Sequence, residues 1–175
     1  MANKKNDKPN PIKIEKNFDE SLTDLFISEL KEIYWSENHL VGAIPKMIDA
    51  AKSPALKKAL SDHLVVTKTH AVRLETIFKQ VKIPVLAKKC DATEGLTMSG
   101  EHVIENTLAG SIAREIGIIG SGIKVEQFEI NFYKGLIDMA TQLGFTNAVK
   151  IFHENLMEEK ESAETLEALK NKKKK

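Results

Sequence analysis

The stretch SIAREIGIIGSGIKVEQFEINFYKGLIDMA, Ser111 to Ala140, decides the fold because an apolar seam at helical spacing runs along it. Glu126 occupies a seam position where the pattern calls for a hydrophobic residue. Burial of an unpaired carboxylate costs several kcal/mol, so Glu126 must be paired, protonated, metal-bound or incompletely buried. The seam consists of Ile116, Ile119, Ile123, Glu126, Ile130, Tyr133, Ile137 and Ala140.

Three further segments carry an apolar seam at the same spacing, and each seam is also interrupted by polar residues. They predict helices over residues 18–52, 54–81 and 147–169. Short turns join the first pair of helices and the last pair, which is typical of an antiparallel four-helix bundle. The polar residues are Glu37 in the first seam, His63, Thr67 and His70 in the second, and Glu159 in the last.

Proline and serine positions predict where these helices begin, bend and end. Pro45 lies inside the first helix and predicts a kink, because proline removes one helical hydrogen bond. Ser53-Pro54 predicts a capped start of the second helix. Residues 84–108 have mixed character, and we expect a loop with one or two short helical turns that crosses the bundle.

Gly117, Gly120 and Gly122 lie within the deciding stretch and disfavour a helix there. Each glycine costs about 1 kcal/mol relative to alanine in a helix interior. A glycine on a helix flank also lets a neighbouring backbone approach closely. We therefore expect tight packing of this helix, within the chain or at a dimer interface.

The composition indicates one domain without a strong field of either sign. The chain has 175 residues, 42% of them hydrophobic, and a net charge of +1. We expect a bundle domain over residues 18–170, between a disordered basic tail at 1–17 and a disordered lysine tail at 171–175. No specific nucleic-acid or membrane partner is expected, and the lack of a signal-peptide pattern favours a cytoplasmic location. Cys90 is the only cysteine, so the chain has no internal disulfide.

The polar seam residues are predicted to meet inside the bundle, because positions equidistant from a hairpin turn lie side by side. A turn near residue 52 places Glu37 opposite residues 67–69, beside His70. A turn near residue 143 places Glu126 opposite residues 160–162, within one turn of Glu159.

Such a cluster requires protons or cations to offset the repulsion between its carboxylates. Oxygen ligands with a histidine nitrogen suit iron or manganese, and zinc is also compatible. Taken singly, a seam glutamate usually reaches water and a seam histidine is usually a hydrogen-bonded core residue; the coincidence across four seams favours a metal site. The candidate ligands are Glu37, His70, Glu126 and Glu159, with Glu129 and His63 as lesser candidates.

Dinuclear carboxylate bundles use one Glu from each of two helices and a Glu-x-x-His motif from each of the other two. Here the second helix has Thr67-x-x-His70 and the last has Glu159-x-x-Ser162, so each paired motif lacks one ligand. A mononuclear and a dinuclear site both remain open at this point.

Several blocks resemble the YciE/YciF-type ferritin-like proteins in order and in spacing, over roughly residues 20–169. The blocks are IYWSENHLVGAIPKM, SPALKKALSDHL, KKCDATEGL, IKVEQFEI and NLMEEKESAETL. The resemblance implies a ferritin-like four-helix bundle with extra short helices between the second and third long helices. It further implies a homodimer, an association with bacterial stress and a dinuclear metal site.

The chain departs from this family pattern at three places. Val65-Val66 stands where family members tend to have acidic residues, Gln127 where they have histidine, and Ala163 where an acidic residue is common. These differences leave a single-metal site or a metal-free protein as alternatives.

Two functions from different classes follow. The first is a ferritin-like metal-binding stress protein that holds iron, or manganese or zinc, and reacts with dioxygen or peroxide. The alternative is a non-catalytic helical dimerisation or interaction module that has lost its metal site. A storage cage is disfavoured because no cage interface is evident.

Overall fold

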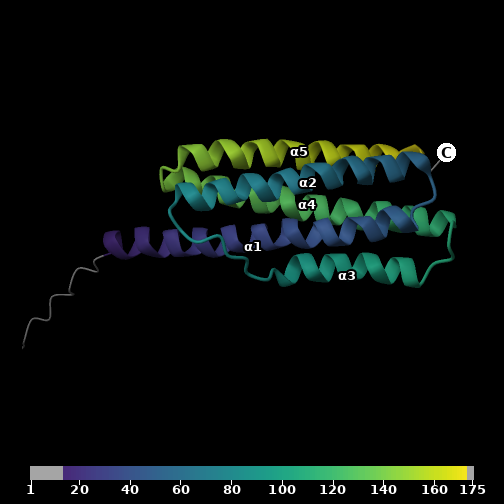
Figure 1. Cartoon of the computed structure of the whole chain (residues 1–175), viewed down its shortest axis with the longest axis horizontal. Helices are drawn as coiled ribbons and strands as arrows, with labels where there is room; N and C mark the ends of the chain where they lie inside the picture. Colours follow the sequence, from purple (N-terminus) through teal and green to yellow (C-terminus); the bar gives the residue numbers. More distant parts are fainter. Residues whose placement is uncertain (1–13, 173–175) are drawn as a thin grey trace, which may run out of the picture.

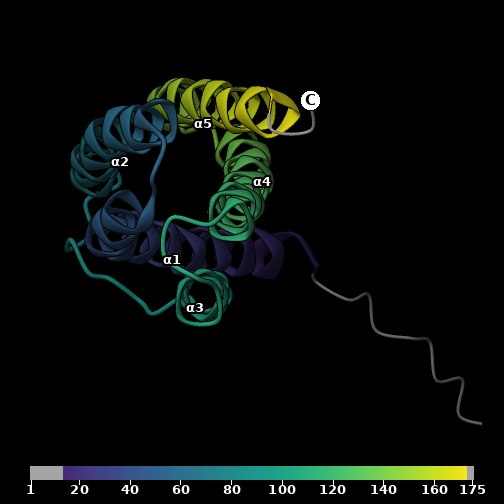
Figure 2. The same ribbon diagram turned by 90° about the vertical axis from the view of Figure 1, so that its right-hand side faces the viewer.

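Four long helices lie side by side and a fifth helix packs outside them in the computed structural model, which describes residues 14–172 and the side chains of residues 21–172. The end-on view shows α1, α2, α5 and α4 in a ring, with α3 outside the ring against α1 (Figure 2). The predicted all-α bundle is confirmed. The helices are α1 (Ile14–Ala50), α2 (Pro54–Gln80), α3 (Asp91–Glu105), α4 (Ile112–Gln142) and α5 (Thr146–Lys172) (Figure 1).

Short turns join α1 to α2 and α4 to α5, so each pair forms an antiparallel hairpin. Ser53 caps α2 by accepting a hydrogen bond from the Leu56 backbone N–H at 3.3 Å, with Pro54 in the first turn as predicted. Glu115 of α4 accepts from the backbone N–H groups of Lys52 and Ser53 at 2.5 and 3.2 Å. This carboxylate therefore ties the first turn to the start of α4.

The connection between α2 and α4 differs from the sequence prediction. It contains one helix of 15 residues, α3, instead of one or two short helical turns. The buried positions of α3 are Thr93, Thr97 and Gly100. Leu96 and Ile104 also pack against the core, but they are only partly buried. The sequence prediction extended this short, mixed pattern to a turn or two and not to a helix of this length.

Helix α3 docks on α1 through hydroxyl groups. The hydroxyls of Ser36 and Thr93 lie 2.7 Å apart, and the His39 ring nitrogen lies 2.8 Å from the Thr97 hydroxyl. Before α3, the Lys88 backbone N–H donates a hydrogen bond to the carbonyl oxygen of Lys31 at 3.1 Å. This bond holds the connection between α2 and α3 along α1.

The helix ends differ by a few residues from the predicted ones. Helix α1 begins at Ile14, before the expected start at residue 18, and α5 continues to Lys172, beyond the expected end at 169. Neither extension meets a proline or a glycine, so nothing local stops the helix. Pro45 lies within α1, and the helix continues past it to Ala50. The rest of the predicted tails, residues 1–13 and 173–175, lies outside the described residues.

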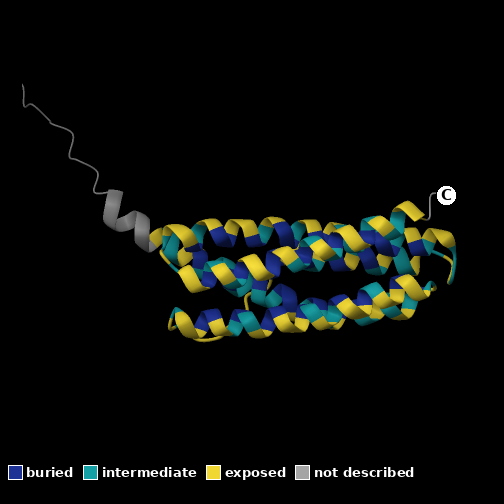
Figure 3. Cartoon of the chain, turned by 90° about the horizontal axis from the view of Figure 1, so that it is seen from above, coloured by how far each residue is buried: buried dark blue, intermediate teal, exposed yellow. Residues whose placement is uncertain are grey.

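Two apolar clusters fill the bundle, and a polar layer separates them along α1, α2 and α4, whereas on α5 the buried Glu159 lies between Leu156 and Ala163 of the first cluster. In α1 the first cluster ends at Ile33 and the second begins at Leu40, with buried Ser36 and Glu37 between them. Buried residues line the inward faces of the helices while exposed residues cover the outside (Figure 3). Ile116 was predicted in the seam of α4 but is 42% exposed, because the inward face near the start of α4 is formed by Ile118 and Ile119.

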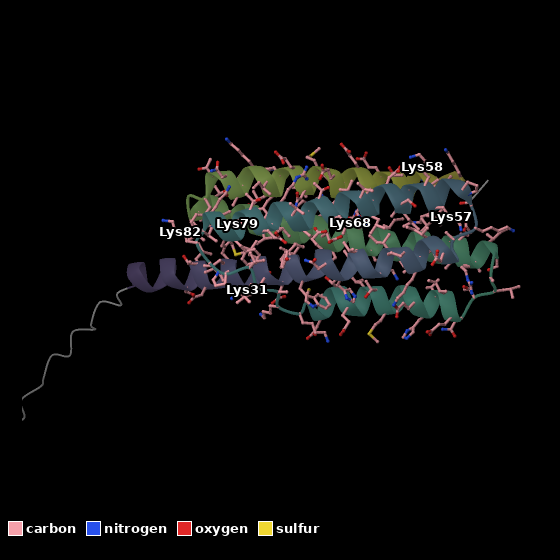
Figure 4. The ribbon with its side chains drawn as sticks, in the orientation of Figure 1. Lys31, Lys57, Lys58, Lys68, Lys79 and Lys82 are labelled. Atoms are coloured by element: carbon pink, nitrogen blue, oxygen red, sulfur yellow. The ribbon has the colours of Figure 1, made fainter. Side chains whose placement is uncertain are left out.

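The outer face of α2 is basic. The outside of the bundle carries four labelled lysines of α2 and Lys31 of α1 (Figure 4). The lysines of α2 are Lys57, Lys58, Lys68 and Lys79. Within residues 14–172 no helix is long and apolar enough to cross a membrane. The homodimer concerns a second chain and stays a prediction.

The glycines of α4 have different surroundings. A Cβ atom at Gly117 would lie 2.3 Å from a methyl carbon of Val103 in α3, whereas a Cβ at Gly120 would meet nothing within 4 Å. Close packing within the chain therefore accounts for Gly117 and not for Gly120.

These two glycines allow a matched test of the α3–α4 contact. Gly117→Ala should destabilise the chain by about 1–3 kcal/mol, because the β-branched Val103 has little rotamer freedom to move away. Gly120→Ala should stabilise it by about 0.5–1 kcal/mol, since alanine favours the helix and the space is open. Urea denaturation followed by circular dichroism measures both, and an equal effect of the two substitutions would contradict this packing.

Candidate metal centre

All six candidate ligands lie in the polar layer, and they form two groups that share one carboxylate. Within each group, one ligand atom from each residue lies within 4.8 Å of all the others. The His70 group consists of Glu37, His70 and Glu159; the His63 group consists of His63, Glu126, Glu129 and Glu159. All six residues are buried.

The spacing along each helix explains why these residues meet. His63 and His70 are two helical turns apart on α2, so both face the bundle interior. Glu126 and Glu129 are one turn apart on α4. The short hairpin turns then fix the register at which α1 meets α2 and α4 meets α5, and this register brings Glu37 beside His70 as predicted.

His70 is surrounded by carboxylates on both sides of its ring. Its Nδ1 lies 3.3 Å from Glu37 Oε1 and 2.9 Å from Glu159 Oε1, and its Nε2 lies 2.7 Å from Glu158 Oε2. The contact with Glu158 has hydrogen-bond geometry, whereas Nδ1 has no hydrogen-bond partner. Nδ1 is therefore the ring nitrogen that faces the group and is available to a ligand there.

His63 occupies the more accessible end of the layer. Its Nε2 lies 3.3 Å from Glu126 Oε1 and 3.9 Å from Glu159 Oε2. Between the two histidines, Thr67 turns its hydroxyl to the backbone carbonyl of His63 at 2.9 Å. Thr67 therefore does not replace the missing glutamate of the paired motif.

Tyr133 belongs to the site, although its sequence position suggested ordinary packing. Its hydroxyl donates a hydrogen bond to Glu37 Oε1 and accepts one from the Asn155 side-chain amide at 3.0 Å. Burial, reinforced by the charge of Glu37, raises the pKa of Tyr133 well above its usual value. The phenol stays protonated at neutral pH and orients one oxygen of Glu37.

Glu158 is a second supporting residue of the site, and the apolar seam gave no indication of this role. It accepts from His70 on one side and from the Arg73 guanidinium at 2.5 Å on the other. Burial alone would raise the pKa of Glu158, but hydrogen bonds from Arg73 and His70 outweigh it and the pKa falls. Glu158 is directly adjacent to Glu159 in the chain and lies on the helix flank, so apolar periodicity gave no signal for it.

The polar layer is short of hydrogen-bond donors. Within the described side chains, seven buried polar atoms have no hydrogen-bond partner, and all seven belong to the candidate ligands. Buried polar atoms without partners are rare in native proteins and call for an explanation such as a bound ion. The atoms are both carboxylate oxygens of Glu129 and of Glu159, one oxygen each of Glu37 and Glu126, and His70 Nδ1.

The proton affinities of the layer reflect the same shortage of positive charge. Burial and the charges of neighbouring glutamates raise the pKa of Glu129 and of Glu159 well above the ordinary value of 4.5. Burial alone would lower the pKa of His70, but the negative charge of nearby Glu37 and the hydrogen bond to Glu158 raise it. Without another cation, the layer holds protons instead.

Comparison with known proteins confirms the resemblance seen in the sequence. Protein YciF of Escherichia coli (strain K12) is 33% identical over 141 residues, which cover 80% of this chain and 84% of YciF. The crystal structure of the E. coli stress protein YciF matches with a TM-score of 0.83 and 30% identity, covering 87% of this chain and 96% of that one. YcfI from Rhodopseudomonas palustris matches with a TM-score of 0.80 and 31% identity, covering 83% and 92% of the two chains.

The model of the family described as "Domain of unknown function (DUF892)" matches residues 21–175, which include all six candidate ligands and the residues around them. The chain therefore belongs to the DUF892 family.

Proposed function

We propose that this protein is a ferritin-like metal-binding stress-response protein, with iron as the preferred metal of its polar layer. The observation that carries the proposal is the set of seven buried ligand atoms without hydrogen-bond partners. Native proteins seldom leave so many polar atoms unsatisfied, and a divalent cation would satisfy several of them at once.

The donor set matches the proposed metal. Each group offers one imidazole nitrogen and at least two carboxylates, and neither contains a cysteine. Oxygen donors with imidazole suit iron and manganese, and the set is also compatible with zinc, so the preference for iron rests on the stress-protein relative and not on the donors alone. Because Glu159 belongs to both groups, its carboxylate would help to hold a metal ion in either group, despite the missing partners of the paired motifs.

The surrounding residues would hold the ligands in place. Tyr133 fixes Glu37, and Glu158 accepts from Nε2 of His70, which leaves Nδ1 to bind the metal. A carboxylate on the far nitrogen of a metal-ligating histidine sets its tautomer and orientation. The burial of Glu37, His70 and Glu159 shields these ligands from bulk water.

Bound iron would supply redox chemistry with dioxygen or peroxide, which agrees with the description of the relative YciF as a stress protein. The protein itself contributes the ligands, their orientation and a protonated phenol beside Glu37. The alternative function, a helical interaction module without metal, keeps the fold but requires that the layer be stabilised by protons alone.

Metal content separates these two functions. Protein purified without chelator, or loaded anaerobically with ferrous iron, should contain close to stoichiometric metal, whereas the Glu126→Ala Glu159→Ala variant should retain little because both groups lose ligands. Elemental analysis of folded protein measures this. The variant Glu105→Ala Glu164→Ala, with two exposed glutamates changed, is the control and should match the wild type. Sub-stoichiometric metal in the wild type after anaerobic loading would refute the metal function.

The hydrogen bond from His70 to Glu158 allows a finer test. Glu158→Gln should weaken metal binding by about 10–100-fold, because the histidine loses the carboxylate that sets its tautomer. Glu154→Gln is the matched control one turn away, since Glu154 is largely exposed and pairs with the same Arg73, at 3.6 Å. Competition with a chelating dye measures both affinities; equal affinities for the two variants would show that Glu158 does not support the ligand.

The pH dependence of metal-free protein tests the charge shortage directly. The raised pKa values of Glu129 and Glu159 stabilise the fold below their unfolded-state value, 4.5, and this stability is lost as the pH rises through the folded-state values. Glu129→Gln should therefore gain stability relative to chelator-treated wild type between pH 5 and 8, by about 1–3 kcal/mol. Chemical denaturation at several pH values measures the difference.

The raised pKa of His70 has the same sign, with loss of stability above its ordinary value of 6.5, while the lowered pKa of Glu158 acts in the opposite direction. Both groups remain in the Glu129→Gln variant, but the charge of Glu129 is one cause of the raised pKa of His70, so the difference between the two proteins reports Glu129 together with its effect on His70. Exposed Glu164→Gln should follow the wild-type profile. Parallel profiles of unfolding free energy against pH for wild type and Glu129→Gln would contradict the prediction, because they would mean that ionisation of Glu129 does not destabilise the fold.

A further inference from the structure

The two ends of the polar layer differ in their access to solvent. Glu37, His70, Glu129 and Glu159 have 0% exposed surface, whereas His63 is 8% and Glu126 is 2% exposed. In this conformation an ion that enters from solvent must pass His63 and Glu126 first.

A cavity of about 170 Å³ adjoins these two residues, with walls from α2 and α5 and with Glu126 of α4 at its inner end. It is large enough for several water molecules. Four carboxylates line it, from Asp62, Glu126, Glu158 and Glu161, together with His63, and no lysine or arginine is among its lining residues. Glu126 Oε2 is one of the buried atoms without a hydrogen-bond partner, so the cavity ends on an unsatisfied carboxylate oxygen.

The charges at the outer end favour cations. Lys58 pairs with Asp62 at 2.6 Å, but this pair is largely exposed and such pairs are weak. Arg73 pairs with Glu158 at 2.5 Å. Glu161 is exposed and has no ion-pair partner within the described residues. The mouth therefore keeps an excess of negative charge.

A second cavity, of about 40 Å³, reaches His63 and Glu126 from the side of α3. Its walls are mainly aliphatic, with Leu40, Ile44 and Val125 among them, and Glu126 is its only carboxylate. A divalent cation gives up hydration water only to other oxygen or nitrogen ligands. On this side only the hydroxyls of Thr97 and Ser121 offer such replacements before Glu126 and His63, and no second carboxylate is present, so it is the poorer route for an ion.

We propose that the cavity between α2 and α5, the acidic portal, is the route by which divalent cations reach the buried centre. Asp62 and Glu161 attract the hydrated cation at the mouth, and Glu126 with His63 receives it at the inner end. Ser162 and Thr165 line the path and offer hydroxyl oxygens on the way. The portal rests on the proposed metal function, since it needs a centre that binds the ion.

The test measures how fast cobalt(II) enters the full chain after chelator treatment, by stopped-flow absorbance of the bound ion, and how much is bound at equilibrium. Ser162→Leu narrows the portal, and Asp62→Asn Glu161→Gln removes charge from its mouth. Ser61→Leu and Glu164→Gln are the matched controls, because both residues are exposed on the same two helices and neither lines the cavity.

At low salt, Ser162→Leu and the charge variant should each slow cobalt entry about tenfold. For the charge variant, this is the size expected from the loss of a focused local field. The amount of cobalt bound at equilibrium should stay the same. The deficit of the charge variant should disappear near ~0.5 M salt, whereas that of Ser162→Leu should persist. The controls should enter at the wild-type rate.

Wild-type entry rates in both portal variants, with full binding at equilibrium, would overturn the portal while leaving the metal centre intact. Failure of the wild type itself to bind cobalt at equilibrium would instead overturn the proposed function and the portal with it. Circular dichroism of each variant verifies the fold before the kinetics are read.

Discussion

Repulsion among buried carboxylates governs the middle of this bundle. Glu37, Glu126, Glu129 and Glu159 lie in one layer, and a proton on His70, whose pKa is raised, would offset only part of their charge. Burial makes each uncompensated charge more costly, because the low-dielectric interior screens it poorly. The fold tolerates this layer since apolar clusters pack around it, and the missing positive charge must come from protons or from a cation.

The same layer depends on helix register, which local contacts at the bundle ends determine. Ser53 lies at the end of the first turn and caps the start of α2. Glu115 of α4 accepts a hydrogen bond from the backbone of that turn. A shift by one residue on any long helix would rotate its ligand about 100° away from the layer. Helix capping far from the ligands is therefore a condition for their convergence.

The sequence predicted the four long helices and all six residues of the layer, because each interrupts or adjoins an apolar seam. It did not predict the supporting residues. Tyr133 fits an apolar seam as well as it fits a hydrogen-bonding role, and Glu158 and Arg73 lie on helix flanks, where charged residues are ordinary. Asn155 lies one turn before Glu159 and is fully buried. It was the one sequence signal for the supporting residues, but a search for hydrophobic residues at helical spacing does not select an asparagine. Helix α3 escaped for a related reason, since its buried residues are small and hydroxyl-bearing.

These supporting residues make the two halves of the layer unequal. In the His70 group, Tyr133 holds Glu37 and Glu158 holds His70, while none of its three members is exposed. In the His63 group, both oxygens of Glu129 lack hydrogen-bond partners and His63 lines the cavity between α2 and α5. Ligands whose orientation is already fixed lose less conformational freedom on binding. The His70 group is thus the preorganised half, the His63 group is the accessible half, and Glu159 is the carboxylate through which a change in one half alters the other.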